Sequence, residues 1–243
     1  MWLPHSLIRT VSSPSGSHDP VREGYILNIF AVVRERRRVL RQHFDVTKQF
    51  EELEETCVPS YVHANPLASG IAWWRLVVAA KLSQKWGKQG PILDFGAATG
   101  EVWHLLGRPN GYEFVEEDET MVEYLQKTNA GARRRTLEAL PIGYYEQIFA
   151  LDSLEHNDDV GELLARLSTC LTDSGTLILS GPTETWLYRL GRRLAGFSGH
   201  YHLTTIYDIE RLAEKHFERL AETSLPVPAV APLFRLTAWS RKP

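Results

Sequence analysis

Asp94 and the glycines that follow it are the residues of this chain that most directly suggest ligand chemistry. They lie in Ile92–Trp103, where an apolar run ends on an acid and a loop of small residues leads into an amphipathic segment. Gly96 and Gly100 permit backbone angles and a close ligand approach that a side chain would forbid. The following helix offers unpaired N–H groups and a partial positive charge. This combination predicts a nucleotide-type site at the carboxyl edge of a parallel sheet.

A second candidate acid follows the next apolar run, as expected for a neighbouring strand. Glu116 and Glu117 come directly after Tyr112–Val115. An ionised carboxylate has two acceptor oxygens and can bind two neighbouring sugar hydroxyls. Glu116 is the predicted acceptor, and Glu117 is expected to be an exposed neighbour.

Three histidines are candidate catalytic bases, because histidine exchanges protons near neutral pH. His156 follows the apolar run 146–151, and His200 and His202 follow a long insertion after the run 176–180. A base is needed when the reacting group must lose a proton, as a hydroxyl does. The alternative is that His156 only orients its loop and that the other two are ordinary residues of a covering segment. Of those two, His202 is the preferred base and His200 a candidate substrate contact.

Acids around His156 raise the question of a metal, since oxygen ligands suit Mg²⁺ or Ca²⁺. We prefer the alternative that acids such as Asp158 and Asp159 complement the N-terminus of the next helix, so no metal is predicted. Cys57 and Cys170 are too few and too far apart for a disulfide framework or a zinc site. That pattern fits a reducing compartment.

The composition is that of an ordinary soluble globular protein. The 243 residues are 43% hydrophobic and 23% charged, with a formal net charge of −3. The overall charge therefore gives no reason to expect nucleic acid as a partner. The most apolar window, Ile71–Ala80, contains Arg75 and is shorter than the ~20 residues of a membrane span. A cytoplasmic location is expected, and the oligomeric state is not predicted.

The chain before the glycine loop is predicted to be a helical extension over residues 21–89, preceded by a disordered tail over 1–20. The basic run Arg34–Arg41 suggests contact with a phosphate or an acidic membrane surface. The preferred alternative is a solvated helix face, partly paired with the glutamates of 51–55.

The second half of the extension carries candidate pocket residues. A loop rich in turn formers contains Tyr61 and His63. The polar groups of these two side chains are predicted to line the substrate side of the site. A helix with one apolar face is predicted over 69–86, since Ile71 and Trp74 begin a helical spacing.

From residue 91 onward the hydrophobic pattern alternates between strands and helices, which predicts a doubly wound parallel sheet with helices on both faces. The last two strands have no helix between them and are expected to form an antiparallel hairpin, giving seven strands. The predicted strands are 92–95, 112–115, 132–137, 146–151, 176–180, 219–224 and 233–240. Helices are predicted from residue 101 and over 119–127, 161–170 and 206–216.

Five motifs in register resemble those of class I S-adenosylmethionine-dependent methyltransferases, over residues 90–243. The nearest subgroup is the small-molecule methyltransferases that include those of ubiquinone biosynthesis. The motifs are Asp94–Gly100, Phe114–Asp118, Thr136–Pro141, Ala150–His156 and Ser174–Ser180. The resemblance implies a Rossmann-like domain with a substrate lid inserted at about 182–204.

The resemblance also implies a contact for each part of the cofactor S-adenosylmethionine. Asp94 would attract the ammonium, and Glu116 would accept the ribose hydroxyls. The segment Thr136, Leu137 and Glu138 would border the adenine. The remaining predicted cofactor contacts are Gly96, Ala97, Gly100, Leu151 and Asp152.

Ala98 departs from the family pattern, because the first motif has a glycine there. Donor binding is expected to survive the extra methyl group, since Gly96 and Gly100 remain. The spacing G-x-x-x-G also differs from the G-x-G-x-x-G of dinucleotide-dependent dehydrogenases.

The predicted activity is methyl transfer from S-adenosylmethionine to a small-molecule acceptor, with oxygen as the preferred acceptor atom. Nitrogen or carbon acceptors, and a methyltransferase-like binding protein without catalysis, are the alternatives. The basic and aromatic segment Trp186–Phe197 is interpreted as a lid, with contact to a lipid surface as the alternative.

Overall fold

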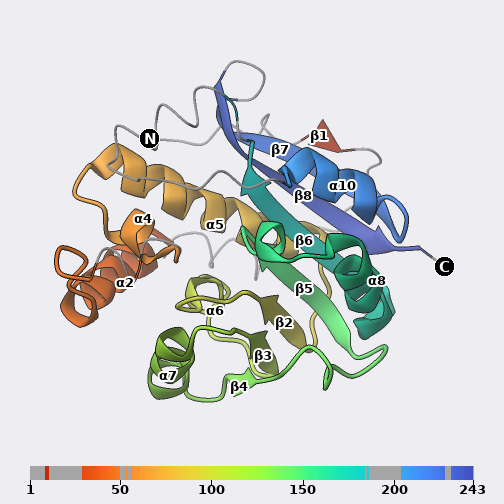
Figure 1. Cartoon of the computed structure of the whole chain (residues 1–243), viewed down its shortest axis with the longest axis horizontal. Helices are drawn as coiled ribbons and strands as arrows, with labels where there is room; N and C mark the ends of the chain where they lie inside the picture. Colours follow the sequence, from red (N-terminus) through yellow and green to blue (C-terminus); the bar gives the residue numbers. More distant parts are fainter. Residues whose placement is uncertain are drawn as a thin grey trace, which may run out of the picture.

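A computed structural model of the protein describes residues 9–10, 29–49, 53, 56–183, 185, 204–227 and 231–242. Within them, one sheet has the strand order β1-β7-β8-β6-β5-β2-β3-β4 (Figure 1). The strands are β1 (Arg9–Thr10), β2 (Ile92–Phe95), β3 (Tyr112–Val115), β4 (Arg133–Arg134), β5 (Tyr145–Leu151), β6 (Leu171–Pro182), β7 (Phe217–Val227) and β8 (Ala231–Arg241). The helices are α2 (Ile29–His43), α4 (Val58–Val62), α5 (Pro66–Trp86), α6 (Glu101–Leu105), α7 (Glu119–Thr128), the 3-10 helix η2 (Leu154–His156), α8 (Val160–Cys170) and α10 (Ile206–Ala213).

The strand order confirms the predicted doubly wound fold. β2 pairs in parallel with β3 on one side and with β5 on the other, so the winding reverses between β2 and β5. β8 runs antiparallel to β6 and β7, as predicted for a C-terminal hairpin. All seven predicted strands are present, and β1 adds an eighth that the sequence did not predict. The carboxyl ends of β2 and β5 meet at the switch point, where open α/β sheets bind ligands.

Several element bounds differ clearly from the prediction, and β6 and β7 are both longer than the predicted strands 176–180 and 219–224. The strand predicted over 132–137 is limited to Arg133–Arg134, because β4 is an edge strand that pairs only with β3. The helix predicted over 206–216 ends at Ala213, shortly before the chain enters β7.

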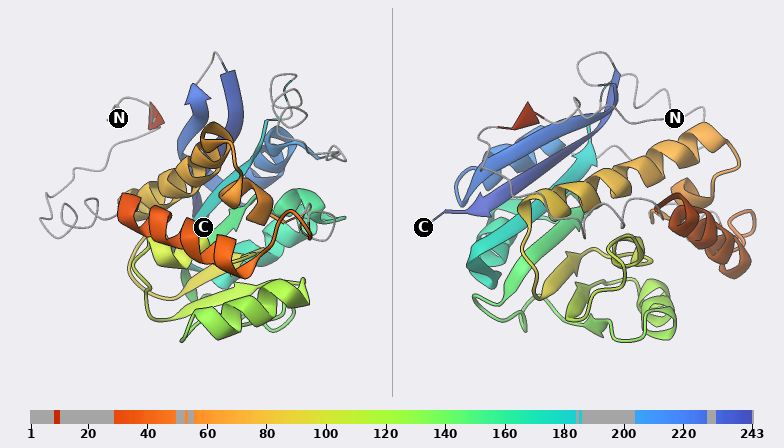
Figure 2. Two further views of the ribbon diagram at one scale, coloured as in Figure 1. Left: turned by 90° about the vertical axis from the view of Figure 1, so that its left-hand side faces the viewer. Right: turned by 180° about the vertical axis from the view of Figure 1, so that it is seen from behind.

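The alternation of side chains along β2 decides which side of the sheet carries the site. Leu93 and Phe95 belong to the core beneath α8 and α10. Ile92 belongs to the core on the opposite side, which it shares with α5 and the N-terminal helices. Asp94 has the same parity as Ile92, so its carboxyl group faces the α5 side. Figure 2 shows α5 crossing this face of the sheet.

Over residues 72–83 helix α5 is buried around most of its circumference, so the prediction of a single apolar face is wrong. Asn65 caps the helix by accepting a hydrogen bond from the Leu67 N–H at 2.9 Å. Trp73 is buried, whereas Ile71 and Trp74 are only half-buried. The reason is tertiary: α5 contacts β6 and β8 on one side and α4 and α6 on the other.

The predicted helical N-terminal region is present. Helix α2 packs against α4 and α6, at the end of the molecule away from β7 and β8 (Figures 1 and 2). Of the predicted tail over 1–20, only Arg9 and Thr10 are described, and they pair with β7 instead of being disordered. No helix in the described part of the chain is long and apolar enough to cross a membrane.

Candidate functional site

The loop after β2 folds back over the carboxyl end of the strand. Gly96 and Gly100 have φ values of 70° and 69°, in the region that favours glycine. A Cβ on Gly96 would overlap the Cβ of Ser153, and one on Gly100 would overlap Leu125. The loop therefore packs directly against the chain after β5 and against α7, and both glycines are required for that approach.

Ala98 adopts the left-handed conformation that the expected glycine would adopt, with φ of 47°. An alanine in this region carries a backbone cost of about 1 kcal/mol. Its N–H donates to Oε2 of Glu116 at 2.7 Å, so the strained residue makes the contact between the loop and β3. Ala98 also lines the cleft described below.

Glu116 lies where the sequence predicted it, at the end of β3 and beside the glycine loop. Its Oε1 accepts hydrogen bonds from the backbone N–H groups of Glu117 and Asp118 at 2.9 and 3.0 Å. Together with the Ala98 contact, three of its roughly four acceptor positions are occupied. Glu117 is exposed, as expected.

Asp94 is the acid at the floor of the site, with 3% of its surface exposed. Its Oδ2 accepts a hydrogen bond from the Tyr112 hydroxyl. Burial raises the pKa of Asp94 to about 7, and the charge of Glu116 adds to the shift, against the Tyr112 hydrogen bond. A carboxyl group in this state gains most from a cationic ligand, which would stabilise its ionised form.

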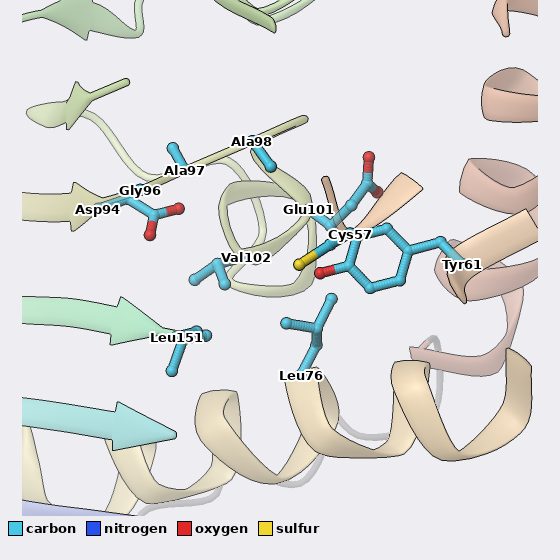
Figure 3. Close-up of a pocket in the computed structure, with 10 residues that line it drawn as sticks. All are labelled: Cys57, Tyr61, Leu76, Asp94, Gly96, Ala97, Ala98, Glu101, Val102 and Leu151. Carbon is cyan, nitrogen blue, oxygen red and sulfur yellow. The ribbon is translucent and has the colours of Figure 1, made fainter. Parts of the chain in front are cut away.

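A cleft of about 270 Å³ lies over Asp94, between the glycine loop and the N-terminal helices. Figure 3 shows the side chains that surround it, with the Cys57 sulfur and the Tyr61 hydroxyl opposite the loop. Its lining residues are Cys57, Tyr61, Leu76, Asp94, Gly96, Ala97, Ala98, Glu101, Val102 and Leu151. The sheet, α6, α4 and α5 all contribute, so the cleft forms only in the assembled fold.

Arg75 of α5 is a residue of this region that the sequence analysis did not select. The side chain is buried, with one guanidinium nitrogen, Nη1, paired with Oδ2 of Asp152. Its Nη2 donates to the Tyr61 hydroxyl at 3.2 Å and lies 3.8 Å from the Cys57 sulfur. The Ser180 hydroxyl holds Oδ1 of Asp152 at 2.7 Å. A charge inside an apolar helix was the available signal, because such a charge must be paired.

A second buried ion pair fixes α2 on the glycine loop. Arg36 donates from Nε and Nη2 to both carboxylate oxygens of Glu101, at 2.9 and 2.8 Å, and Nη2 also contacts the Tyr124 hydroxyl at 2.8 Å. Glu101 begins α6 directly after Gly100 and lines the cleft. Burial raises the pKa of Glu101, and Arg36 opposes that shift. The position of α2 is thereby tied to the loop over the cleft.

Some of the predicted substrate and cofactor contacts lie at the cleft, and others lie outside its lining. Tyr61, Ala97 and Leu151 line the cleft, and Asp152 adjoins it through Arg75. The adenine segment lies beyond β4 and outside the cleft lining: Thr136 and Glu138 are exposed and Leu137 is half-buried.

The two candidate histidines that the structure describes, His63 and His156, are outside the cleft lining. His63 follows α4, and its Nδ1 accepts a hydrogen bond from the Asn65 N–H at 3.0 Å. His156 is exposed in η2, three residues after Ser153, which packs on Gly96. His200, His202 and the predicted lid Trp186–Phe197 lie outside the described residues. No group of three or more metal-ligating side chains occurs among the residues that the structure describes.

Comparison with known proteins identifies the family in which this fold and its glycine loop occur. Residues 74–220, more than half of the chain, match a family model described as a methyltransferase domain. The chain belongs to this methyltransferase family. The resemblance to class I enzymes is confirmed, and S-adenosylmethionine is the methyl donor; the ubiquinone-type subgroup stays a prediction.

Solved structures share the methyltransferase's fold at low sequence identity. The PH0226 protein of Pyrococcus horikoshii OT3 has 17% identity and a TM-score of 0.58, covering 76% of this chain and 96% of that one. Magnesium protoporphyrin IX methyltransferase of Synechocystis PCC 6803, with bound SAH, has 21% identity, a TM-score of 0.52 and coverage of 74% and 89%. N-methyltransferase NodS of Bradyrhizobium japonicum WM9 has 12% identity, a TM-score of 0.53 and coverage of 74% and 99%. A search of curated proteins finds no match.

Proposed function

We propose that this methyltransferase acts on a small molecule and transfers the methyl group to an oxygen atom. The observation that carries the proposal is the make-up of the cleft: Tyr61 and Leu76 of the N-terminal helices line it together with Asp94 and the glycine loop. A cleft lined from both sides in this way suits a small ligand better than a folded macromolecule.

The donor's amino-acid end would lie over Asp94 and Arg75. Its ammonium would stabilise the ionised form of Asp94, whose pKa of about 7 leaves room for that effect. Its carboxylate needs a cation, and Arg75 presents Nη2 to the neutral Tyr61 and Cys57 at the cleft wall. Arg36 is the weaker candidate for binding this carboxylate, because its Nε and Nη2 already donate to both oxygens of Glu101.

The donor's ribose would be held by Glu116. Because backbone N–H groups fill three of its roughly four acceptor positions, binding both hydroxyls requires the carboxylate to release one of them. The Ala98 contact is the one that faces the loop, so donor binding would shift Ala98.

Methyl transfer would be an in-line displacement. The acceptor oxygen attacks the methyl carbon, the carbon–sulfur bond breaks, and its electrons stay on the sulfur of the thioether product. Holding the oxygen in line with the sulfur supplies much of the rate. The hydroxyl proton passes to a base, for which His156 and His202 are the candidates, either directly or through water.

Replacing Glu116 by alanine tests the donor site. Loss of charge-assisted hydrogen bonds should weaken S-adenosylmethionine binding by about 1–3 kcal/mol in isothermal titration. The matched control is Glu117→Ala, which removes the neighbouring exposed acid and should leave affinity unchanged. Equal affinity in both variants would remove Glu116 from the ribose role.

A labelled-methyl screen tests the acceptor. The wild-type protein, with labelled S-adenosylmethionine, is incubated with matched sets of alcohols or phenols, amines and carbon acids. Label in an ether product supports the proposal, whereas label only in amines or carbon products would overturn the oxygen assignment. Donor binding without transfer to any class would favour the non-catalytic alternative.

A further inference from the structure

Helix α2 carries a stripe of cations that no described acid neutralises. Phe30, Arg34, Arg37 and Arg41 follow each other at intervals of four, three and four residues, which places them on one side of the helix. An adjacent side of the helix, about a third of a turn away, is the one that packs, through Arg36 and Leu40. Phe30 is 75% exposed, Arg34 and Arg41 are exposed, and Arg37 is half-buried.

The three arginines of this stripe make no ion pair within the described part of the chain. Arg41 donates to the backbone carbonyl of Val62 at 3.1 Å, and both Arg37 and Arg41 lie within 3.5 Å of the His63 carbonyl. Carbonyl groups accept hydrogen bonds without cancelling charge. The Nε of Arg37 is buried with no hydrogen-bond partner, and burial together with Arg41 lowers the pKa of Arg37. Positive charge is thus concentrated on a molecule whose net charge is −3.

The shape of the stripe argues for a flat, extended partner. From Phe30 to Arg41 it spans about 16 Å along a straight helix. Arg37 and Arg41 meet at the His63 carbonyl, whereas Phe30 and Arg34 extend the stripe toward the start of the helix. Its two ends differ, because the first turn presents an aromatic ring. A second apolar side chain, Leu67, is 70% exposed at the start of α5, four residues beyond His63. In the left view of Figure 2, α2 faces outward.

We propose that this face, made by Phe30, Arg34, Arg37, Arg41 and Leu67, docks on an acidic lipid bilayer surface. Arginines attract the negative surface potential of anionic lipids, while exposed apolar side chains enter the headgroup region. The apolar pair favours a bilayer over nucleic acid, whose phosphate backbone offers nothing for Phe30 and Leu67 to bury against. The surface adjoins the cleft wall, since Arg41 contacts the carbonyl of the residue after Tyr61.

Vesicle sedimentation tests the proposal on the full chain. The wild-type protein should sediment with vesicles of phosphatidylcholine and phosphatidylglycerol, less at high salt, and not with phosphatidylcholine alone. The triple variant Arg34→Gln, Arg37→Gln, Arg41→Gln should lose about a hundredfold in partitioning, since each cation near the surface contributes. The matched control Lys127→Gln, Arg133→Gln, Lys215→Gln removes equal charge from exposed sites elsewhere and should bind as wild type.

A second variant protects the test from a folding artefact, because Arg37 and Arg41 also contact α4. The double variant Phe30→Ser, Arg34→Gln changes only exposed side chains and should still lose at least about tenfold. No sedimentation of the wild type, equal loss in the matched control, or unchanged binding in both stripe variants would overturn the proposal. Salt-dependent binding to duplex DNA but not to vesicles would overturn it in favour of a nucleic-acid surface.

Discussion

At the scale of single residues, the surroundings of Asp94 favour the binding of a cation. The carboxyl group is buried, its only polar partner among the described residues is the neutral Tyr112 hydroxyl, and its pKa rises to about 7. Near pH 7 such a carboxyl group is about half ionised, so a small change in its surroundings changes its charge. The donor's ammonium would be such a change.

Donor affinity should therefore depend on pH through Asp94. Below pH 7 the free site must lose a proton to bind the ammonium, so affinity should rise with pH by up to about tenfold per unit and level off above 7. Isothermal titration between about pH 5.5 and 7.5 in buffers of different ionisation enthalpy measures both the affinity and the proton release. In Asp94→Asn the affinity should be weak and nearly independent of pH over that range. A pH-independent wild type would contradict this role.

The same residue should make the free protein less stable as pH rises. The folded-state pKa of Asp94 lies above its ordinary value of 3.8, so the folded state binds more protons than the unfolded chain between pH 3.8 and 7. The free energy of unfolding contributed by this group falls over that interval and is constant above it. Asp94→Asn should accordingly melt at a higher temperature than the wild type at pH 8, and by a smaller margin at pH 4.

At the scale of elements, the turn between β2 and α6 is fixed by what packs against it. Gly96 combines a φ of 70° with direct contact against Ser153 after β5. Ala98 shows that the left-handed conformation alone does not demand glycine. The close approach of two loops at the switch point is therefore the stronger constraint.

Gly96→Ala, compared with a second glycine substitution, tests whether the left-handed backbone conformation or the close approach to Ser153 matters more for the site. It introduces backbone strain and an overlap with Ser153, so donor affinity in titration calorimetry should fall more than about tenfold. Gly143→Ala is the matched control, because φ there is 60° and no atom lies within 4 Å of the added Cβ. That control should lose about 1 kcal/mol of stability and keep donor affinity. Equal donor affinity in both variants would show that the approach to Ser153 does not shape the site.

The pairing of α2 with α6 is a second element-level feature with a measurable energy. Arg36→Ala would leave Glu101 buried without its partner, and we expect a loss of about 3–5 kcal/mol in the free energy of unfolding. Arg38→Ala, which breaks the exposed pair with Glu35 on the same helix, should change stability little. Urea unfolding of the two variants measures the difference. A small loss for Arg36→Ala would mean that α2 is not held by this pair.

At the scale of the whole molecule, the cleft lies between two walls that buried ion pairs help to hold together. One wall comes from β2, β5 and the glycine loop, and the other comes from α4 and α5. Arg36 and Arg75 each carry an ion pair between the N-terminal helices and the sheet side. A ligand in the cleft would add contacts to both walls at once.

Donor or product binding should consequently stabilise both walls together. At a hundred times its Kd, S-adenosylhomocysteine should raise the free energy of unfolding by about 2.7 kcal/mol, seen as a higher Tm. Hydrogen exchange should slow in α4 and α6 beyond any global effect, while β7 and α10 follow the global change only. Protection confined to the sheet side would argue that the N-terminal helices do not contact the ligand.

The sequence by itself determined the features that depend on neighbours in the chain. The bounds of β2 and β3, the glycine turn and the position of Glu116 all follow from local patterns. The C-terminal hairpin followed from the missing helix between its strands. The family resemblance followed from such motifs in their order, and the comparisons confirmed it.

Only the tertiary structure decided which distant side chains meet. Arg36 pairs with Glu101, which lies 65 positions away in the sequence, and Arg75 pairs with Asp152. Both contacts depend on how the helices pack on the sheet. The burial of α5 around most of its circumference over residues 72–83 and the raised pKa of Asp94 have the same origin. Local periodicity cannot encode these features, since burial and ion pairing are set by the elements that surround a side chain, whatever their distance along the chain.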